Sequence, residues 1–212
     1  RNNFAGKGGL VIMVSLSTGR LGKQPDPALP VLVFFAYAFF GYIMECIVLT
    51  IEKRHLVINR GFARRLPFCI IYGFGAMLGY ALLHPLANNL VVLFVVGALA
   101  ATGFEYCTAM LQIKIFGDFW WDYSQKPLNY KGILCLESTL GWGVVAVSVI
   151  GVLHKMLVQL VARVPSRIAA ILAVGLLFAY TTDFALSARQ AARQKRRREE
   201  EYQDTVSENI LL

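Results

Sequence analysis

The sequence predicts an all-α membrane protein, a bundle of about five transmembrane helices. Of its 212 residues, 57% are hydrophobic and only 16% are charged, whereas a soluble domain carries about a quarter charged residues. The hydrophobic residues form long blocks, and most of the charged residues fall between the blocks. Long apolar blocks separated by charged connections are typical of helices that cross a bilayer several times.

The apolar blocks divide the chain into an arm, a membrane domain and a tail. Residues 1–28 are predicted to form a flexible or interfacial arm, residues 29–188 the transmembrane domain, and residues 189–212 a charged tail. The five spans are predicted at residues 29–51, 66–83, 90–116, 132–153 and 168–188, the fourth with an extension to Val161. Each approaches or exceeds the ~20 residues that a helix needs to cross ~30 Å of hydrocarbon, and the second is the shortest.

The basic residues indicate how these spans are oriented. If the spans alternate in direction, 14 of the 21 Lys and Arg residues fall on the side of the tail and 7 on the other side. Lys and Arg are more frequent in cytoplasmic connections than in external ones. We therefore expect the C-terminal tail in the cytoplasm and the N-terminus outside.

Four of the spans carry one acidic residue each, and all four acids fall toward the predicted cytoplasmic side. They are Glu45, Glu105, Glu137 and Asp183. A carboxylate inside a span costs roughly 2.5–3.5 kcal/mol on insertion scales, so it normally faces the bundle interior or a wet cavity. We expect Glu105 and Glu137 to lie deeper. For Glu45 and Asp183, snorkelling to the interface or pairing with loop arginines such as Arg60 is an equally good interpretation.

Polar and small residues continue this pattern along two spans. On the third span, Thr102, Glu105, Thr108 and Gln112 recur at helical spacing and predict one polar stripe. On the second, Tyr72 shares a face with two glycines, Gly75 and Gly79. Because Gly-x-x-x-Gly lets helices approach closely in membranes, this face is predicted to pack against another helix.

The connection between the third and fourth spans, Gly117 to Gly132, is unusually rich in polar and aromatic residues. Trp120, Trp121 and Tyr123 suit the membrane–water interface, where an aromatic ring with one polar edge is favoured. That preference does not explain the carboxylates and amide that accompany them, which are Asp118, Asp122 and Asn129. A lid, a re-entrant turn or a coupling segment would explain both.

Several chemistries find no support in the sequence. It contains neither a P-loop nor an HExxH motif, and no CxxC or Cys/His spacing for zinc. The two histidines at the predicted outer side, His84 and His154, lie away from the acids, which argues against a Ser–His or Cys–His pair there. The basic residues flank apolar blocks, so they suit lipid and topology and no nucleic acid is expected as a partner.

A metal site made only of carboxylates remains open. Hard cations such as Mg²⁺ prefer oxygen ligands, and the candidates are Glu105, Asp118, Asp122 and Glu137. A divalent cation is thus the one cofactor that the pattern allows, and no other is expected in this chain.

A set of short motifs resembles one bacterial family. The motifs are Asn59-Arg60-Gly61-Phe62, the segment 67–75 (PFCIIYGFG), the segment 102–106 (TGFEY), the segment 121–124 (WDYS) with 127–129 (PLN) and Gly132, and Trp142-Gly143. Over about Val31 to Gly151 the chain resembles the type IV ABC-transporter permeases of the CmpB type, with WDYSxxPxN as the most specific part. The resemblance implies a multi-pass permease subunit in the bacterial cytoplasmic membrane that works with a separate ATPase.

Three hypotheses for function follow. The first is a permease that moves a cationic or lipid-like solute through an acid-lined cavity open to the cytoplasm. The second is a membrane enzyme acting on a lipid or isoprenoid head group, and the third is a non-catalytic scaffold. Besides the bilayer, the partners considered are an ATPase subunit and a second copy of the chain. The candidate binding or gating residues are Glu45, Arg60, Tyr72, Glu105, Trp121, Asp122, Tyr123, Asn129, Glu137 and Asp183.

Overall fold

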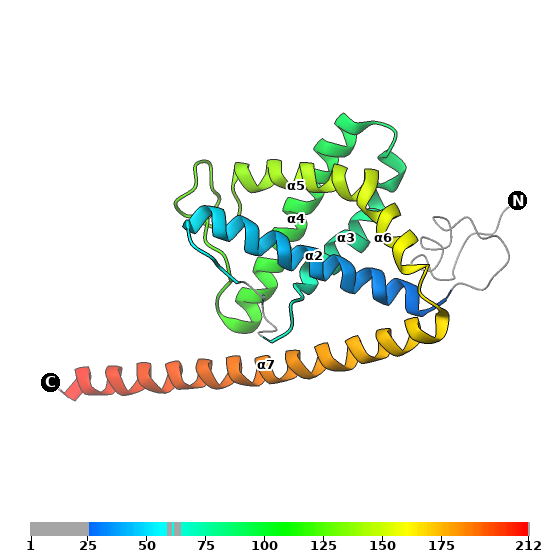
Figure 1. Ribbon diagram of the computed structural model, residues 1–212. Coiled ribbons are helices and arrows are strands. Elements are labelled where there is room, and N and C mark those ends of the chain that lie inside the picture. The colour runs from blue at the N-terminus through cyan, green and yellow to red at the C-terminus, as the bar shows by residue number, and fades with distance from the viewer. Residues whose placement is uncertain (1–25, 59–60, 62–64, 212) are drawn as a thin grey trace, which may run out of the picture.

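A computed structural model describes residues 26–58, 61 and 65–211, and in this part of the chain the protein is all α-helical (Figure 1). The helices are α2 (Ala28–Lys53), α3 (Ile70–Leu83), α4 (Leu90–Phe116), α5 (Leu136–Ser148), α6 (His154–Val161) and α7 (Ser166–Leu211). A 3-10 turn, η1 (His84–Leu86), follows α3. A π-helical turn, η2 (Val149–Leu153), joins α5 to α6 in one continuous helical run.

Four stretches of helix have the length and apolar character needed to cross a membrane. These are Ala28–Lys53, Leu90–Phe116, Leu136–Val161 and Ser166–Tyr202. The predicted helical bundle is therefore confirmed with four long spans and one shorter apolar helix, α3. Residues 189–211, predicted as a separate tail, continue α7 as helix past the bundle (Figure 1).

The predicted second span, residues 66–83, is wrong at its start. Helix α3 begins only at Ile70 and has 14 residues, about 21 Å of helix. Pro67 disfavours helical backbone at Leu66, and Cys69 N–H donates to Ala38 O in the middle of α2 at 3.0 Å. Residues 65–69 therefore run non-helically beside α2, and only then does α3 start.

The fourth span also begins later than predicted, at Leu136 and not at residue 132. Gly132 has φ +68°, and Tyr130 and Leu134 form an isolated antiparallel bridge. A residue in the left-handed region ends regular helix, so the turn must be completed before α5 can start.

Small residues bring the helices close together. On α2, Gly41 lies directly against Tyr72 of α3, and on α4, Gly97 lies directly against Ala146 of α5. Neither position has room for a Cβ, which is typical of tightly packed membrane helices. By contrast, Gly79, which the sequence predicted at a close contact, has open space beside it.

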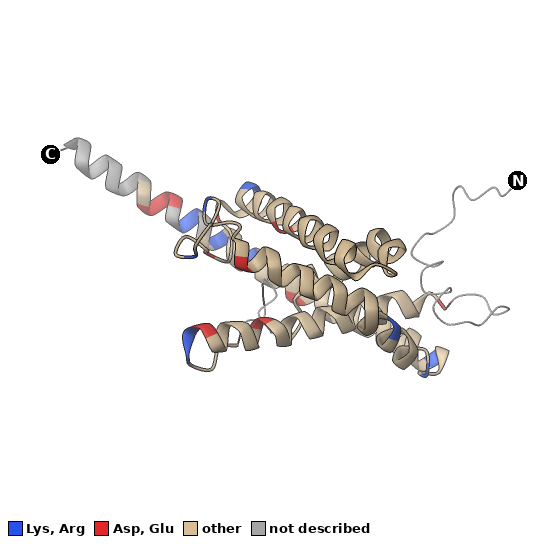
Figure 2. Cartoon of the chain, turned by 90° about the horizontal axis from the view of Figure 1, so that it is seen from above, with Lys and Arg blue, Asp and Glu red and all other residues tan. Residues whose placement is uncertain are grey.

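The bundle has two ends, and the charged side chains are distributed unequally between them. Helices α2 and α4 end, and α5 begins, at what we call the charged end, past which α7 continues (Figure 1). Most of the Lys, Arg, Asp and Glu residues in the described part of the chain lie at this end or on the extension of α7 (Figure 2). The opposite end contains the start of α2, the α3–α4 connection and the α6–α7 connection.

Candidate functional site

Glu105 on α4 is one of the two buried carboxylates among the described residues and is only 5% exposed. Its Oε2 accepts hydrogen bonds from Trp142 Nε1 at 3.0 Å and from the Ser138 hydroxyl at 3.5 Å, both on α5. Its Oε1 accepts one from the Tyr123 hydroxyl at 3.2 Å. Glu105 is thus held by donors from α5 and from the α4–α5 connection, as predicted for an acid that faces the bundle interior.

A second carboxylate lies nearby. Glu45 on α2 accepts a hydrogen bond from the Tyr72 hydroxyl on α3, and the Tyr72 ring lies 6.0 Å from the Trp142 ring. Glu45 is close enough to Glu105 for their charges to repel. We call Glu45, Tyr72, Glu105, Tyr123 and Trp142 the carboxylate cluster.

Tyr123 belongs to the connection outside the helices, and its hydroxyl stays a donor. Burial and the negative charge of Glu105 raise the pKa of Tyr123 well above its usual value. A neutral phenol can then donate to the Glu105 carboxylate throughout the physiological pH range.

Glu137, which was predicted to lie deeper in its span as Glu105 does, is not enclosed. Glu137 is in the first turn of α5, and its side chain is 70% exposed. Successive residues of a helix point about 100° apart, so the next residue, Ser138, is the one that faces Glu105. Neither Ser138 nor Trp142 was predicted from the sequence as a site residue, although Trp142 follows Ser138 by one turn and lies on the same face.

The predicted polar stripe of α4 is present in part. Thr102 donates to Thr139 of α5 at 3.1 Å, and Gln112, 7% exposed, accepts from Trp120 N–H at 3.2 Å. Thr108, in contrast, bonds back to Phe104 O within its own helix. The stripe therefore fixes α5 on one side of Glu105 and the connection on the other.

The connection of residues 117–135, which we call the lid, is held by its own polar side chains. Asp122 Oδ1 accepts from the backbone N–H and the hydroxyl of Ser124, at 2.9 and 2.5 Å, and these bonds lower the pKa of Asp122. Asn129 donates to Ser124 O and Lys126 O and accepts from Gly132 N–H. Asp122 and Asn129 thus build the turn and do not reach the carboxylate cluster.

Two further contacts fix the lid in place. Trp121 Nε1 donates to Ile133 O at 2.8 Å, and Tyr123 N–H donates to Gly132 O at 2.8 Å. A Cβ at Gly132 would lie 2.6 Å from the Ser124 hydroxyl, so glycine is needed there for space as well as for its positive φ. Of the two lid residues Trp121 and Tyr123, only Tyr123 contacts an acid in the described part of the chain.

Lys126 ties the lid to the two neighbouring helices. Its Nζ lies 3.0 Å from Glu52 Oε1 at the end of α2 and 3.1 Å from Glu137 Oε2 at the start of α5. Hydrogen bonds to Glu52 and Glu137 raise the pKa of Lys126 above its ordinary value of 10.5. The exposed Glu137 therefore serves the lid and not the buried cluster.

We expect Lys126→Gln to loosen the lid without unfolding the bundle, since exposed ion pairs contribute little to global stability. Because the pKa of Lys126 is raised on folding, its contribution is complete below pH 10.5 and is lost as the pH rises through the higher folded value. Faster amide hydrogen exchange over residues 117–135 would confirm this. Lys131→Gln, which changes a lid lysine placed over the Tyr130 ring, is the control. An equal rate of amide hydrogen exchange over residues 117–135 in both variants would contradict a role of Lys126 in holding the lid.

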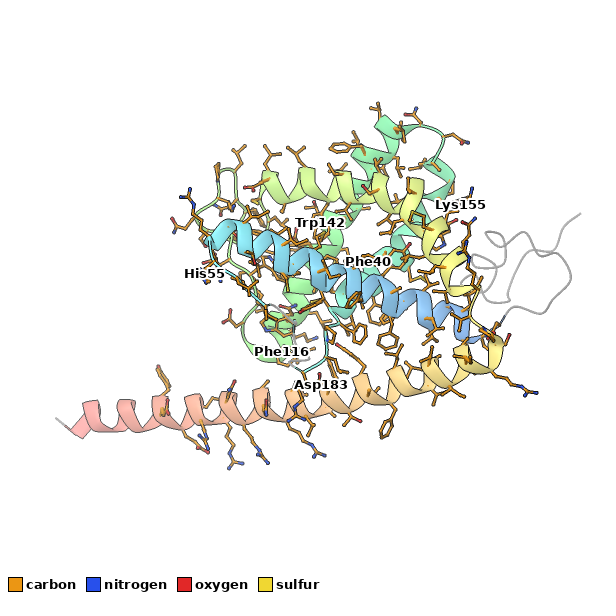
Figure 3. The ribbon with its side chains drawn as sticks, in the orientation of Figure 1. Phe40, His55, Phe116, Trp142, Lys155 and Asp183 are labelled. Carbon is orange, nitrogen blue, oxygen red and sulfur yellow. The ribbon has the colours of Figure 1, made fainter. Side chains whose placement is uncertain are left out.

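Asp183 on α7 is buried, at 4% exposure, and so does not snorkel to the interface (Figure 3). Its Oδ2 accepts from the backbone N–H groups of Arg65 and Leu66, at 3.0 and 2.9 Å. Non-helical backbone at membrane depth needs partners for its polar groups. Asp183 supplies them where the chain turns into the bundle ahead of α3, which is a structural role.

Asp183→Ala is expected to destabilise the bundle by about 1–3 kcal/mol, because two backbone N–H groups lose their acceptor. Thr182→Ala is the matched control, since Thr182 is exposed and bonds only back to Phe178 O among the described contacts. Unfolding of both variants by a denaturing detergent measures the difference. If Asp183→Ala is no less stable than Thr182→Ala, the capping role is wrong.

The four candidate metal ligands do not come together. Among the described residues, no three His, Cys, Asp or Glu side chains lie close enough to hold one ion. Asp118 is exposed and accepts from Phe119 N–H, while Asp122 and Glu137 face the lid. Arg60, the other predicted site residue, lies outside the described residues. The structure thus unites Glu45, Tyr72, Glu105 and Tyr123, and places Trp121, Asp122, Asn129, Glu137 and Asp183 in supporting positions.

Comparison with known proteins gives one match. Residues 32–188 match the model of a protein family described as "Putative ABC-transporter type IV". The matched segment spans more than half of the chain and contains the whole carboxylate cluster and lid, whereas the extension of α7 lies beyond it. Neither the curated proteins nor the solved structures gave a match.

Proposed function

The chain belongs to the family of putative type IV ABC transporters, and we propose that it is a membrane-spanning transporter subunit whose carboxylate cluster binds a cationic solute. The observation that carries this proposal is the placement of Glu105. It is 5% exposed inside a membrane bundle, close to a second acid, Glu45. A carboxylate at such a position is costly and is usually functional.

The chemistry of the cluster supports a cation as the ligand. Among the described residues, the donors to Glu105 are an indole, a phenol and an aliphatic hydroxyl, which are all neutral. Hydrogen bonds from neutral groups stabilise a carboxylate but leave its charge uncompensated. The negative charge of Glu105 therefore attracts a cation, and two aromatic rings, those of Tyr72 and Trp142, lie nearby.

The lid supplies a means of control. Tyr123 belongs to the lid and also donates to Glu105, so an outward movement of the lid would remove one hydrogen bond from the carboxylate. Solute binding and lid position are therefore linked through this residue. We place the lid and the charged end in the cytoplasm on the positive-inside rule, in a bacterial cytoplasmic membrane. There the lid and the extension of α7 would form the docking surface for a separate ATPase.

A panel of small probes tests the proposal on the purified full chain. Thermal unfolding is measured with methylammonium, choline, K⁺ and Mg²⁺ as chlorides, and with sodium acetate and methanol as the anionic and neutral controls. A bound ligand stabilises the folded state by mass action. We expect at least one cation to raise the Tm by more than either control does. No rise with any cation would refute a cation-binding cluster.

A further inference from the structure

The most buried polar side chain at the opposite end belongs to His154, the first residue of α6. It is 1% exposed, its Nδ1 lies 2.9 Å from the Tyr37 hydroxyl of α2, and its ring stacks on Tyr80 of α3 with centroids 3.4 Å apart. Its other nitrogen, Nε2, has no hydrogen-bond partner among the described residues. An unsatisfied buried polar group costs about 1–3 kcal/mol, so this arrangement requires an explanation.

These residues form a second polar layer in the helices that build the carboxylate cluster. Tyr37 and Glu45 share α2, and Tyr72 and Tyr80 share α3. In each helix the two residues lie about 12 Å apart at 1.5 Å per residue. Tyr37 and Tyr80 belong to a buried hydrophobic core that also contains Met77, Val149 and Ile150. On the proposed function, a solute that moves from the carboxylate cluster to the opposite end would pass this core and the layer of His154.

The backbone at this layer is irregular. Val149 and Ile150 belong to η2, the π-helical turn that directly precedes His154. A π turn holds one residue more than an α turn and is frequent at functional sites. Its return to α-helix would rotate the following helix by about 100° and would carry His154 away from Tyr37 and Tyr80.

We propose that Tyr37, Tyr80 and His154 form a proton-operated gate at the opposite end of the bundle. The gate is closed while the imidazole is neutral and opens when it takes a proton from water at that end. The proton adds to the ring nitrogen that lacks hydrogen, so both nitrogens carry N–H. One donates to the Tyr37 hydroxyl oxygen, and the other has no acceptor among the described residues. A charged, unpaired donor in an apolar core is unfavourable, so the helix end moves to admit water.

Few other titratable groups face His154. Tyr37 approaches from α2 and Tyr80 from α3, and His84 of η1 lies 4.9 Å from the Tyr80 ring and opposes a second positive charge at His154. Lys155, the next residue of α6, is exposed. None of these groups offers a negative charge to hold the imidazolium in place, which is why protonation favours opening.

Hydrogen exchange of the amides of residues 154–161, in the full chain in lipid nanodiscs, tests the gate. We expect protection, corrected for intrinsic exchange, to fall about tenfold between about pH 7.5 and about pH 5. His154→Gln should abolish this dependence on pH. His84→Gln should retain it and serves as the control. An equal loss of protection in His154→Gln, or no loss in the unmodified chain, would overturn the proposal.

A second variant, Tyr37→Phe, tests the gate independently if His154→Gln does not fold. Tyr37→Phe keeps the imidazole but removes its hydrogen-bond partner, so the midpoint of the opening transition should shift. Tyr180→Phe, a buried tyrosine that packs on Phe35 and not on His154, should leave the midpoint unchanged. An unchanged midpoint in Tyr37→Phe would also overturn the gate. The inference uses the proposed function only in that a transport path must open at both ends, and the exchange result stands whether or not a cation binds Glu105.

Discussion

Replacing Glu105 by glutamine is expected to abolish stabilisation by cations and to lower the stability of the chain itself. The amide keeps the size of the side chain but loses the negative charge, and its NH2 group meets donors where an acceptor is needed. Trp142, Tyr123 and Ser138 all donate to this carboxylate. We expect a loss of about 1–3 kcal/mol in the free energy of unfolding, measured by unfolding in denaturing detergent.

The matched control is Glu137→Gln. Both acids lie toward the charged end, but Glu137 is 70% exposed and pairs with Lys126. Its replacement should leave cation-dependent stabilisation intact and loosen only the lid. If Glu137→Gln removes the effect of cations as completely as Glu105→Gln does, the response comes from general surface charge and not from the buried cluster.

Gly41→Ala is expected to separate α2 from α3. The added Cβ would overlap the Cβ and Cγ atoms of Tyr72, which are the root of that side chain, so Tyr72 cannot yield unless α3 moves. Overpacking of this kind costs about 1–3 kcal/mol. The movement would also break the hydrogen bond from Tyr72 to Glu45. We therefore expect a lower unfolding free energy together with weaker stabilisation by cations.

Gly79→Ala provides the comparison, because a Cβ at Gly79 meets nothing within 4 Å. Both variants make the same chemical change in neighbouring helices, and only Gly41 lies at a close contact. We expect Gly79→Ala to stay within about 0.5 kcal/mol of the unmodified chain. Two variants of equal stability would mean that α2 and α3 do not pack as closely as the structure has them.

Helix positions set by local signals could be predicted from the sequence. Helix α4 occupies the predicted residues 90–116 because Asn89 caps its start, accepting from Val92 N–H, and Gly117 ends it with φ +79°. The start of α3 could not be predicted, because it depends on the bond from Cys69 to Ala38, which are distant in sequence. A prediction from apolar composition alone starts the second span at residue 66 and so includes Pro67.

The acidic residues of the candidate site could be predicted from the sequence, but the role of each could not. Which of two adjacent residues faces inward depends on helix rotation, and so Glu137 was selected where Ser138 makes the contact. For Asp183 the sequence left snorkelling or pairing with a loop arginine as an equal alternative, because only the fold shows that the backbone N–H groups of Arg65 and Leu66 donate to it. His154 was set aside for lying far from the acids, yet it is the most enclosed polar residue of the opposite end.

The central claim, that a cation binds beside Glu105, is tested most directly by ¹⁹F NMR of the full chain labelled with 5-fluorotryptophan. The chain has three tryptophans, and Trp142→Phe assigns the resonance of the one that donates to Glu105. The probe is whichever cation of the panel raises the Tm most. We expect it to shift the Trp142 resonance in the unmodified chain, to leave that of the exposed Trp120 in place, and to shift neither in Glu105→Gln. A Trp142 resonance that does not move, or that moves equally in Glu105→Gln, would contradict the claim.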